Sequence, residues 1–406
     1  MDPAWLLLLL PAAALSGWFA ATKKEHVVKS QTDRLPDAYF KGLSFLLNEE
    51  PDKALQVFLE VVEIDKETIE MHTALGSLFR RRGEVERATR IHQNLVARSD
   101  LDQGLRTMAL FELAQDYFKA GLFDRAENLF QELTQMEDYR ESAYRFLLQI
   151  YDQEKEWSNA IVVAEDLQRV SGQNISITIA QYHCELAEKA ITEGDMDKAQ
   201  RYLRFSFRND PHCVRATSQS GRVASMLGNH TNAIAIWRGL EHWSPANLGE
   251  VVGHIGNSYE ELGDMVSFQY FLESALDKAP DPRIISTLVD LVSRNQGEDK
   301  GQALLVELVR KHPNLDSLFQ LIQSRAGNEE SDADLSIVAS LISQVVDKER
   351  EYNCRQCGFS THSIHWQCPG CKGWATVQKK SIQRLAGHHS DKFLDSSSSQ
   401  RLSFAS

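Results

Sequence analysis

The sequence predicts an all-α protein: a solenoid of helical hairpins with an N-terminal transmembrane helix and a small C-terminal metal-binding domain. Three features of the chain lead to this prediction. An uncharged apolar run opens it, small and aromatic residues recur about every 34 residues through its middle, and four cysteines fall within 18 residues near its end. At 406 residues, 42% apolar and 25% charged, the composition is that of a globular chain.

The charge balance and the cysteine count limit the classes of function. The chain has 44 basic and 57 acidic residues, which gives a net charge of −13. Because binding to a phosphate backbone needs a basic surface, we do not expect nucleic acid as a partner. Six cysteines are too few for a disulfide framework in a chain of this length, so a reducing compartment is favoured.

Residues 1–22 are expected to form a membrane anchor. The stretch from Trp5 to Ala21 carries no charge and, at about 1.5 Å per residue, reaches roughly 25 Å, which is enough to span a bilayer with help from its flanks. A cleaved signal peptide is the alternative, but such a peptide begins with a basic segment, and no Lys or Arg precedes this apolar run.

A basic linker over residues 23–35 follows the anchor and sets the expected topology. It contains Lys23, Lys24, Lys29 and Arg34. Because basic residues beside a transmembrane helix stay in the cytoplasm, we expect a single-pass protein with the bulk of the chain on the cytoplasmic side.

Residues 36–282 carry a repeat of about 34 residues. Three pairs are 34 residues apart, and an alanine then recurs at intervals of 34 to 39: Gly42–Gly76, Phe45–Phe79, Ala54–Ala88, then Ala126, Ala160, Ala199 and Ala233. A small residue lets the two helices of a hairpin cross closely, and an aromatic residue fills the groove one turn further on. Repeats that cannot bury their faces alone stack in a row, so the period predicts seven hairpins in a solenoid. A single globular helical domain is the alternative.

Glycine and proline mark the expected ends of these helices. A glycine at the turn between two helices can adopt the left-handed backbone conformation that caps a helix, and a proline stops one. The turn glycines are Gly83, Gly121, Gly194, Gly228 and Gly263, and the prolines that close repeats are Pro211, Pro245 and Pro280. Residues 283–349 keep the helical period without the small and aromatic signature, so we expect one or two degenerate repeats that cap the stack.

The first helix of each hairpin should line a groove for a partner. Positions one and four residues beyond the small residue are expected to point into it, which gives Arg80, Gln115, Gln149, Arg222 and Asn257. Each, taken singly, is more often a solvated polar side chain than a contact with a partner. The expected ligand is a peptide segment or a protein surface, because the sequence contains no phosphate-binding glycine loop. Whether copies of the chain associate as a homo-oligomer is left open.

Residues 350–380 are expected to form a four-cysteine metal domain. Two Cys-x-x-Cys knuckles, Cys354/Cys357 and Cys368/Cys371, are separated by ten residues. Four thiolates arranged in this way hold one tetrahedral ion, either zinc or iron, and leave no ligand position open for water or substrate. The alternative is two disulfides or four free thiols. A domain this small cannot fold by burial alone, so the metal should supply its folding free energy.

Other residues of this domain have expected structural roles. Gly358 should turn the chain after the first knuckle, Gly370 or Gly373 should do so at the second, and the short gap between knuckles implies a two-strand connection. The aromatic core should come from Phe359, Trp366 and Trp374. The histidines His362 and His365 are taken as plain loop residues.

The two remaining cysteines and the C-terminal tail are expected to have ordinary structural roles. Cys184 and Cys213 lie within the helical repeats, where buried free thiols are ordinary. Residues 381–406, with serines from Ser396 to Ser399, should be a disordered tail.

Several of these motifs resemble known families. The segments LGSLFRRRGEVERA and LAQDYFKAGLFDRA resemble the tetratricopeptide repeat, and the Cys-Pro-Gly-Cys knuckle resembles that of a shortened, rubredoxin-like or zinc-ribbon domain. Together with the opening FKGLSFLLNEEPDKA and the terminal CRQCGF and CPGCKGWAT motifs, they resemble the lipopolysaccharide assembly protein B family of Gram-negative bacteria.

The resemblance implies an inner-membrane scaffold that regulates lipopolysaccharide synthesis and is not an enzyme. Its implied role is to present the deacetylase of the lipid A pathway to a membrane-bound ATP-dependent protease, and to coordinate other synthesis enzymes. Two alternatives come from other classes of protein. One is a rubredoxin-like electron-transfer protein on a repeat scaffold, and the other is a zinc ribbon that binds nucleic acid, which the net charge of −13 disfavours.

Overall fold

A computed structural model describes residues 66–326, 333–346 and 352–379, together with a few positions between 40 and 57. The predicted anchor (1–22), basic linker (23–35) and tail (381–406) lie outside the described residues. Each helix in the described ranges is too short or too polar to cross a bilayer. The chain divides into two compact units, Met1–Ile150 and Tyr151–Ser406.

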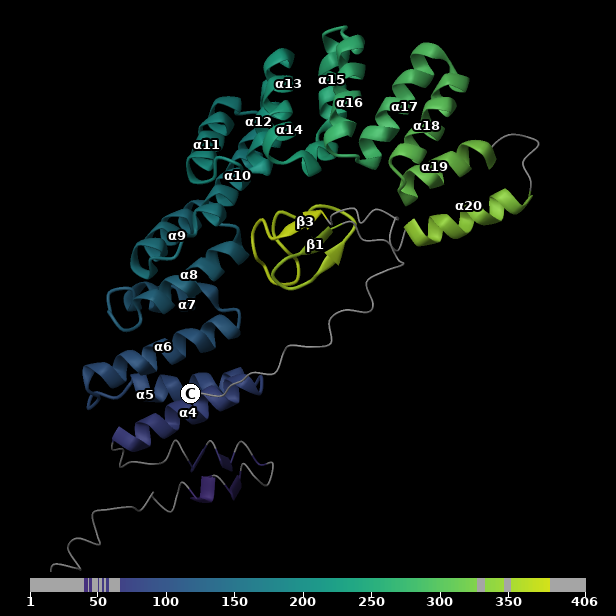
Figure 1. Cartoon of the computed structure of the whole chain (residues 1–406). Helices are drawn as coiled ribbons and strands as arrows, with labels where there is room; N and C mark the ends of the chain where they lie inside the picture. Colours follow the sequence, from purple (N-terminus) through teal and green to yellow (C-terminus); the bar gives the residue numbers. More distant parts are fainter. Residues whose placement is uncertain are drawn as a thin grey trace, which may run out of the picture. The chain divides into compact units, whose positions relative to one another are not determined.

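The first unit is built from helical hairpins (Figure 1). Helix α6 packs against both α4 and α5, so each hairpin buries its apolar face against the next one. The helices are α4 Lys66–Arg81, α5 Val85–Val96, α6 Gln103–Lys119 and α7 Phe123–Leu133, followed by α8 Arg140–Glu154, which begins in this unit and ends in the second.

The second unit continues the same design. Helix α10 packs against α9, α11 and α12, and α12 packs against α13. The helices are α9 Trp157–Ser171, α10 Ser176–Glu193, α11 Met196–Asn209, α12 Val214–Met226, α13 His230–Arg238, α14 Leu240–Trp243, the 3₁₀ helix η2 Pro245–Glu250, α15 Val252–Glu261, α16 Met265–Lys278, α17 Pro282–Gln296, α18 Glu298–Lys311, α19 Leu315–Ala326 and α20 Ala333–Val346.

The alanine period predicted from the sequence is confirmed. All six alanines have an exposed fraction of 0%, and the five from Ala88 onward are each the fourth residue of the second helix of a hairpin. The turn glycines are confirmed as well, because the five have φ between +69° and +84°. A side chain at such a φ strains the backbone, which explains the choice of glycine.

A small residue is also needed where the first helix of a hairpin crosses the second. A methyl group on Gly76 would lie 2.4 Å from the ring of His92, and one on Gly221 would lie 2.2 Å from the indole of Trp237. Trp237 is buried, and its Nε1 donates a hydrogen bond to the carbonyl oxygen of Ser218 at 3.1 Å. The absent side chain therefore makes room for a large one.

The hairpin pattern changes before α15. Helix α14 and the 3₁₀ helix η2 stand between α13 and α15, and Pro245 is the first residue of η2. Beyond α16, helices α17 and α18 extend a continuous apolar core that includes Ile285 and Leu305. The segment expected to be degenerate is therefore helical, with Pro282 opening α17.

A small sheet follows the helices. Strands β1 Tyr352–Cys354, β2 Ser360–Thr361 and β3 Val377–Lys379 form an antiparallel sheet in the order β2-β1-β3. The sheet therefore has a third strand beyond the two that were expected. Strand β3 comes after the second knuckle and pairs with β1, since Cys354 lies opposite Val377. We call residues 352–379 the metal module.

The close approach of Gly221 to Trp237 gives a testable prediction. Gly221→Ala should destabilise the hairpin of α12 and α13 by about 1 to 3 kcal/mol, because the new methyl overpacks the core. Faster amide hydrogen exchange in α12 and α13 would report the loss. Gly253→Ala is the matched control, since nothing lies within 4 Å of its added methyl, and it should leave exchange unchanged or slower. Equal exchange in both variants would show that the crossing tolerates a side chain.

Candidate metal centre and its seat on the repeats

The first knuckle closes a tight loop at the end of β1. The N–H of Gly358 donates to the carbonyl oxygen of Cys354 at 2.9 Å, and the N–H of Cys354 donates to the carbonyl oxygen of Phe359 at 2.7 Å. Gly358 has a φ of +75°, so its predicted role in the turn is confirmed.

The second knuckle repeats this pattern. The N–H of Lys372 donates to the carbonyl oxygen of Cys368 at 2.9 Å, and the N–H of Cys368 donates to the carbonyl oxygen of Gly373 at 2.9 Å. The residue with positive φ is Lys372, at +59°, so the expectation that Gly370 or Gly373 makes this turn was wrong.

Both glycines of the second knuckle instead leave space. A methyl on Gly373 would lie 2.4 Å from the side-chain oxygen of Gln356, and one on Gly370 would lie 3.3 Å from the sulfur of Cys357. The two knuckles can therefore approach each other because these positions lack side chains.

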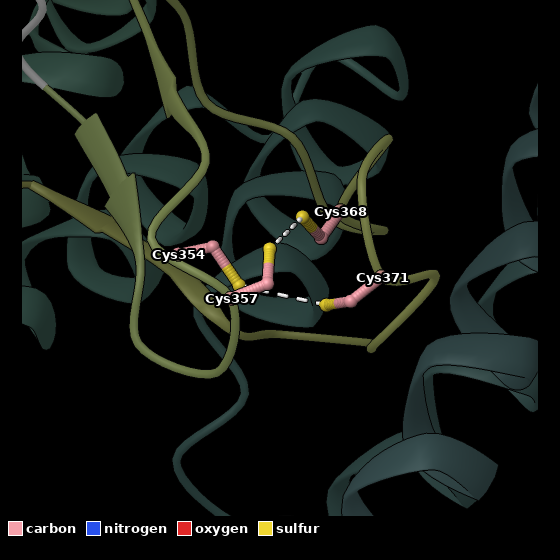
Figure 2. A group of neighbouring side chains, drawn as sticks. All are labelled: Cys354, Cys357, Cys368 and Cys371. Atoms are coloured by element: carbon pink, nitrogen blue, oxygen red, sulfur yellow. Dashed lines mark hydrogen bonds between the residues drawn. The ribbon is translucent and has the colours of Figure 1, made fainter.

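The four cysteine sulfurs face one another across the two knuckles (Figure 2). All four lie within 4.8 Å of one another, with Cys354–Cys371 at 3.7 Å and Cys357–Cys368 at 3.6 Å. A tetrahedral ion about 2.3 Å from each sulfur would set the sulfurs about 3.8 Å apart. A disulfide would need about 2.05 Å. The geometry fits one metal ion, and the arrangement could hold zinc or iron.

The surroundings of Cys354 favour the thiolate that a metal requires, whereas those of Cys357 do not: the backbone N–H of Phe359 lowers the pKa of Cys357, but burial and the other thiols raise it overall. The hydroxyl of Thr376 lies 3.3 Å from the sulfur of Cys354, and this hydrogen bond lowers the pKa of the thiol to about 6. Cys354 and Cys368 are buried, whereas Cys357 is exposed at the outer surface of the module. In the described ranges, the four cysteines form the one cluster of metal-ligating side chains, and His362 and His365 are not part of it.

The core of the metal module is small and contains no tryptophan. It consists of Tyr352, Cys354, Cys368 and Val377, with Phe359 and Ile364 packed beside it. Phe359 therefore has its expected place. The expectation that the two tryptophans also wrap this core was wrong, because both face the helical repeats of the second unit.

Trp374 makes the most specific contact with the repeats. Its ring meets Trp157 and Tyr182 edge to face, with centroids 5.8 and 5.6 Å apart. Its Nε1 donates to a carboxylate oxygen of Asp152 at 3.0 Å, and the amide of Gln367 donates to the other oxygen. Burial raises the pKa of Asp152, and the two hydrogen bonds oppose that rise. We call these contacts the Trp374 seat.

Other contacts hold the module at points further along the second unit. The guanidinium of Arg215 in α12 lies 5.9 Å from the ring centre of Trp366. The hydroxyl of Tyr352 accepts a hydrogen bond from Arg283 at 2.8 Å and donates one to Glu250. Burial and the neighbouring Glu250 raise the pKa of this hydroxyl.

An ion pair completes the contact. Lys379 and Asp281, the N-cap residue of α17, are paired while only 9% and 4% exposed. The residues that receive the module therefore come from α8, α9, α10, α12, η2 and α17. Sequence reasoning missed them, and no local pattern marks them, because a first-turn tryptophan such as Trp157 is an ordinary core residue of a hairpin.

The five residues predicted to line a groove have different surroundings. Arg80 is paired with Asp116 at 2.8 Å and Glu112 at 2.6 Å inside the first unit. Burial by itself would raise the pKa of Glu112, but the hydrogen bonds from Arg80 and Ser77 lower it overall. The charge of Arg80 is therefore paired inside the repeats.

The other four residues differ in exposure and partners. Gln115 donates to Glu112 and Arg222 pairs with Glu188, whereas Gln149 and Asn257 are exposed. A role in binding stays a prediction for all five.

A helical-repeat array that carries a closed four-thiolate module defines a class of protein, the helical-repeat scaffolds with a metal-binding domain. Models of two families match the chain: the one described as Rubredoxin metal binding domain over residues 352–379, and the Tetratricopeptide repeat over residues 111–172.

Relatives with known names cover almost the whole chain. Lipopolysaccharide assembly protein B of Escherichia coli K12 is 32% identical over 386 residues, which is 94% of this chain and 99% of that protein. The protein of the same name from Haemophilus influenzae is 31% identical over 93% of this chain and 98% of that protein. The chain belongs to the lipopolysaccharide assembly protein B family.

A solved tetratricopeptide repeat protein from Parabacteroides merdae is also similar. It is 17% identical, with 63% of this chain and 97% of that chain covered and a TM-score of 0.28.

The Trp374 seat should be separable from metal binding. Trp374→Ala keeps all four cysteines but removes the aromatic contacts and the hydrogen bond to Asp152, which should weaken seating by about 2 to 4 kcal/mol. Metal content should stay unchanged, while hydrogen exchange rises in α8 and α10. Ser363→Ala, at an exposed position of the module, is the matched control and should leave exchange unaltered. Metal loss from the Trp374→Ala protein would contradict the separation.

Proposed function

We propose that this chain is an inner-membrane-anchored cytoplasmic adaptor that regulates lipopolysaccharide synthesis. The relationship to lipopolysaccharide assembly protein B carries the proposal, because it extends over 94% of the chain and takes in the repeats and the metal module together. Helical repeats bind peptides or protein surfaces, which is what a scaffold for enzymes requires.

The proposed partners are proteins of one pathway. The adaptor presents the deacetylase of the lipid A pathway to a membrane-bound ATP-dependent protease and brings other lipopolysaccharide synthesis enzymes together. Anchoring by residues 1–22, followed by the basic linker 23–35, would hold the repeats near the cytoplasmic face of the membrane. Confinement of this kind raises the effective concentration toward partners that are also in the membrane.

The metal has a structural part in this proposal. Cys354, Cys357, Cys368 and Cys371 are the proposed ligands of one zinc or iron ion. A metal that links two knuckles supplies the folding free energy that the small core lacks, so it keeps Trp374 in the position where the repeats receive it.

Replacing one ligand tests the metal assignment. Cys357→Ser should lower the apparent metal affinity by more than roughly 100-fold. Loss of a residue that only hydrogen-bonds a metal ligand costs roughly 10 to 100-fold, and this substitution removes a ligand from a closed set of four thiolates. Metal analysis of the purified chain should give one ion per intact chain and much less for the variant. Cys184→Ser, at a buried cysteine outside the module, is the control and should keep the ion. Full metal content in Cys357→Ser would remove this cysteine from the ligand set.

A capture experiment from membranes tests the adaptor role. The intact chain should retrieve the deacetylase and the protease together. Two variants then separate the contribution of the seat from that of the metal: Trp374→Ala removes the seat, and the double variant Cys354→Ser, Cys357→Ser removes two metal ligands. Partners lost in both variants need the seated module, and partners lost in the double variant alone need the folded module. Failure of the intact chain to retrieve either enzyme after cross-linking would sink the proposal.

A further inference from the structure

A second pair of cysteines lies away from the metal centre. Cys184 is in the middle of α10, and Cys213 is the N-cap residue of α12. Their sulfurs are 3.9 Å apart, and the two residues are 0% and 1% exposed. Cys213 follows the turn after α11 instead of lying inside a helix. A shift of about 2 Å in this turn would bring the sulfurs to bonding distance, which is about 2.05 Å.

The two sulfurs have unequal surroundings. The sulfur of Cys213 accepts hydrogen bonds from the amide of Gln181 at 3.4 Å and from the N–H of Ala216 at 3.5 Å. The sulfur of Cys184 has one such polar neighbour besides Cys213, the hydroxyl of Ser206 at 3.3 Å. The hydrogen bond from Cys184, helped by the N–H of Ala216, lowers the pKa of Cys213, whereas burial raises the pKa of Cys184. One sulfur is therefore set up as the nucleophile and the other as its thiol partner.

Simple packing does not account for these contacts. A cysteine that serves only as a small apolar residue needs no hydrogen-bond donors, yet Gln181 directs its amide N–H to a sulfur while its own oxygen is buried without a partner. Sulfur is also a weaker N-cap than the oxygen of Ser, Thr, Asp or Asn. The two sulfurs therefore face each other as a pair, with two N–H donors directed at the sulfur of Cys213.

We propose that Cys184 and Cys213 form a reversible disulfide in response to hydrogen peroxide or an organic hydroperoxide. The thiolate of Cys213 attacks one oxygen of the peroxide, and the O–O bond breaks to give a sulfenic acid. The hydroxide that leaves, or the alkoxide of an organic hydroperoxide, takes up the proton that the Cys213 thiol had lost. The sulfur of Cys184 then attacks the sulfenic sulfur, the S–S bond forms as the S–O bond breaks, and the second hydroxide takes the proton of Cys184. Two thiols and one hydrogen peroxide become one disulfide and two water molecules, an organic hydroperoxide gives one alcohol and one water instead, and an added dithiol reduces the disulfide again.

The disulfide would act on the contact with the metal module. Arg215 is two residues beyond Cys213, and it pairs at 2.8 Å with Glu185, the residue that follows Cys184. The same guanidinium lies over the ring of Trp366 in the module. Drawing Cys213 toward α10 therefore moves the start of α12, which carries this contact. The inference is independent of the proposed role in lipopolysaccharide synthesis.

Peptide mapping of the metal-loaded full chain tests the proposal. After treatment with hydrogen peroxide, blocking of free thiols and digestion with trypsin, we expect residues 170–189 linked to residues 209–215. Dithiothreitol before digestion should abolish the linked peptide. Because Cys357 is exposed, its oxidation is followed separately on the peptide that contains it. The proposal would be overturned if Cys184 and Cys213 both remained open to alkylation under conditions that oxidise Cys357.

Two variants assign the order of the steps. In Cys184→Ser the reaction should stop at a sulfenic acid on Cys213, which dimedone traps, and in Cys213→Ser the thiol of Cys184 should stay reduced. Equal trapping at Cys184 in Cys213→Ser would overturn the assignment of the nucleophile. If either variant fails to fold, the linked peptide of the unmodified chain still decides whether the disulfide forms.

Discussion

The indole of Trp374 needs an apolar surface for its ring and an acceptor for its N–H, and three successive helices supply both at one point. Trp157 and Tyr182 meet the ring, and Asp152 accepts from Nε1 at 3.0 Å. Without this seat the side chain of Trp374 would be exposed to water, and the partly buried carboxylate of Asp152 in α8 would lose a donor. The position of the metal module on the repeats depends on this seat, whereas the internal fold of the module depends on the four cysteines.

Charge makes the contact selective. Residues 352–379 contain no Asp or Glu, in a chain whose net charge is −13. The repeats offer carboxylates where the module offers donors: Asp152 to Trp374, Glu250 to Tyr352, and Asp281 to Lys379. Complementary groups of this kind fix the register of one surface on another more than they add to affinity. The module is therefore set in one orientation along the second unit.

The same helices serve the seat and the dithiol. Helix α10 carries Tyr182 two residues before Cys184, and the start of α12 carries Cys213 two residues before Arg215. A chemical change at the sulfur of Cys213 is thus close to Arg215, which contacts Trp366 of the module. In a repeat array each helix contacts its neighbours, so a local shift passes to the next hairpin. An adaptor built in this way can link the state of a small site to a surface that binds proteins.

Local constraints were predictable from the sequence. The alanine period and the turn glycines follow from sterics within one hairpin, and the two knuckles follow from ligand spacing within a few residues. These features recur at fixed offsets, so they can be recognised without a structure.

Contacts between distant segments were not predictable. Trp374 and Asp152 are 222 residues apart, and the two sulfurs outside the module come from positions 29 residues apart. The pairing of Arg80 with Asp116, 36 residues further on, was not predicted either. The sequence by itself determined which helices form and which cysteines can share a metal, since neighbours along the chain decide both. Only the tertiary structure decided where the tryptophans lie and which thiols meet, because those contacts depend on how folded elements pack.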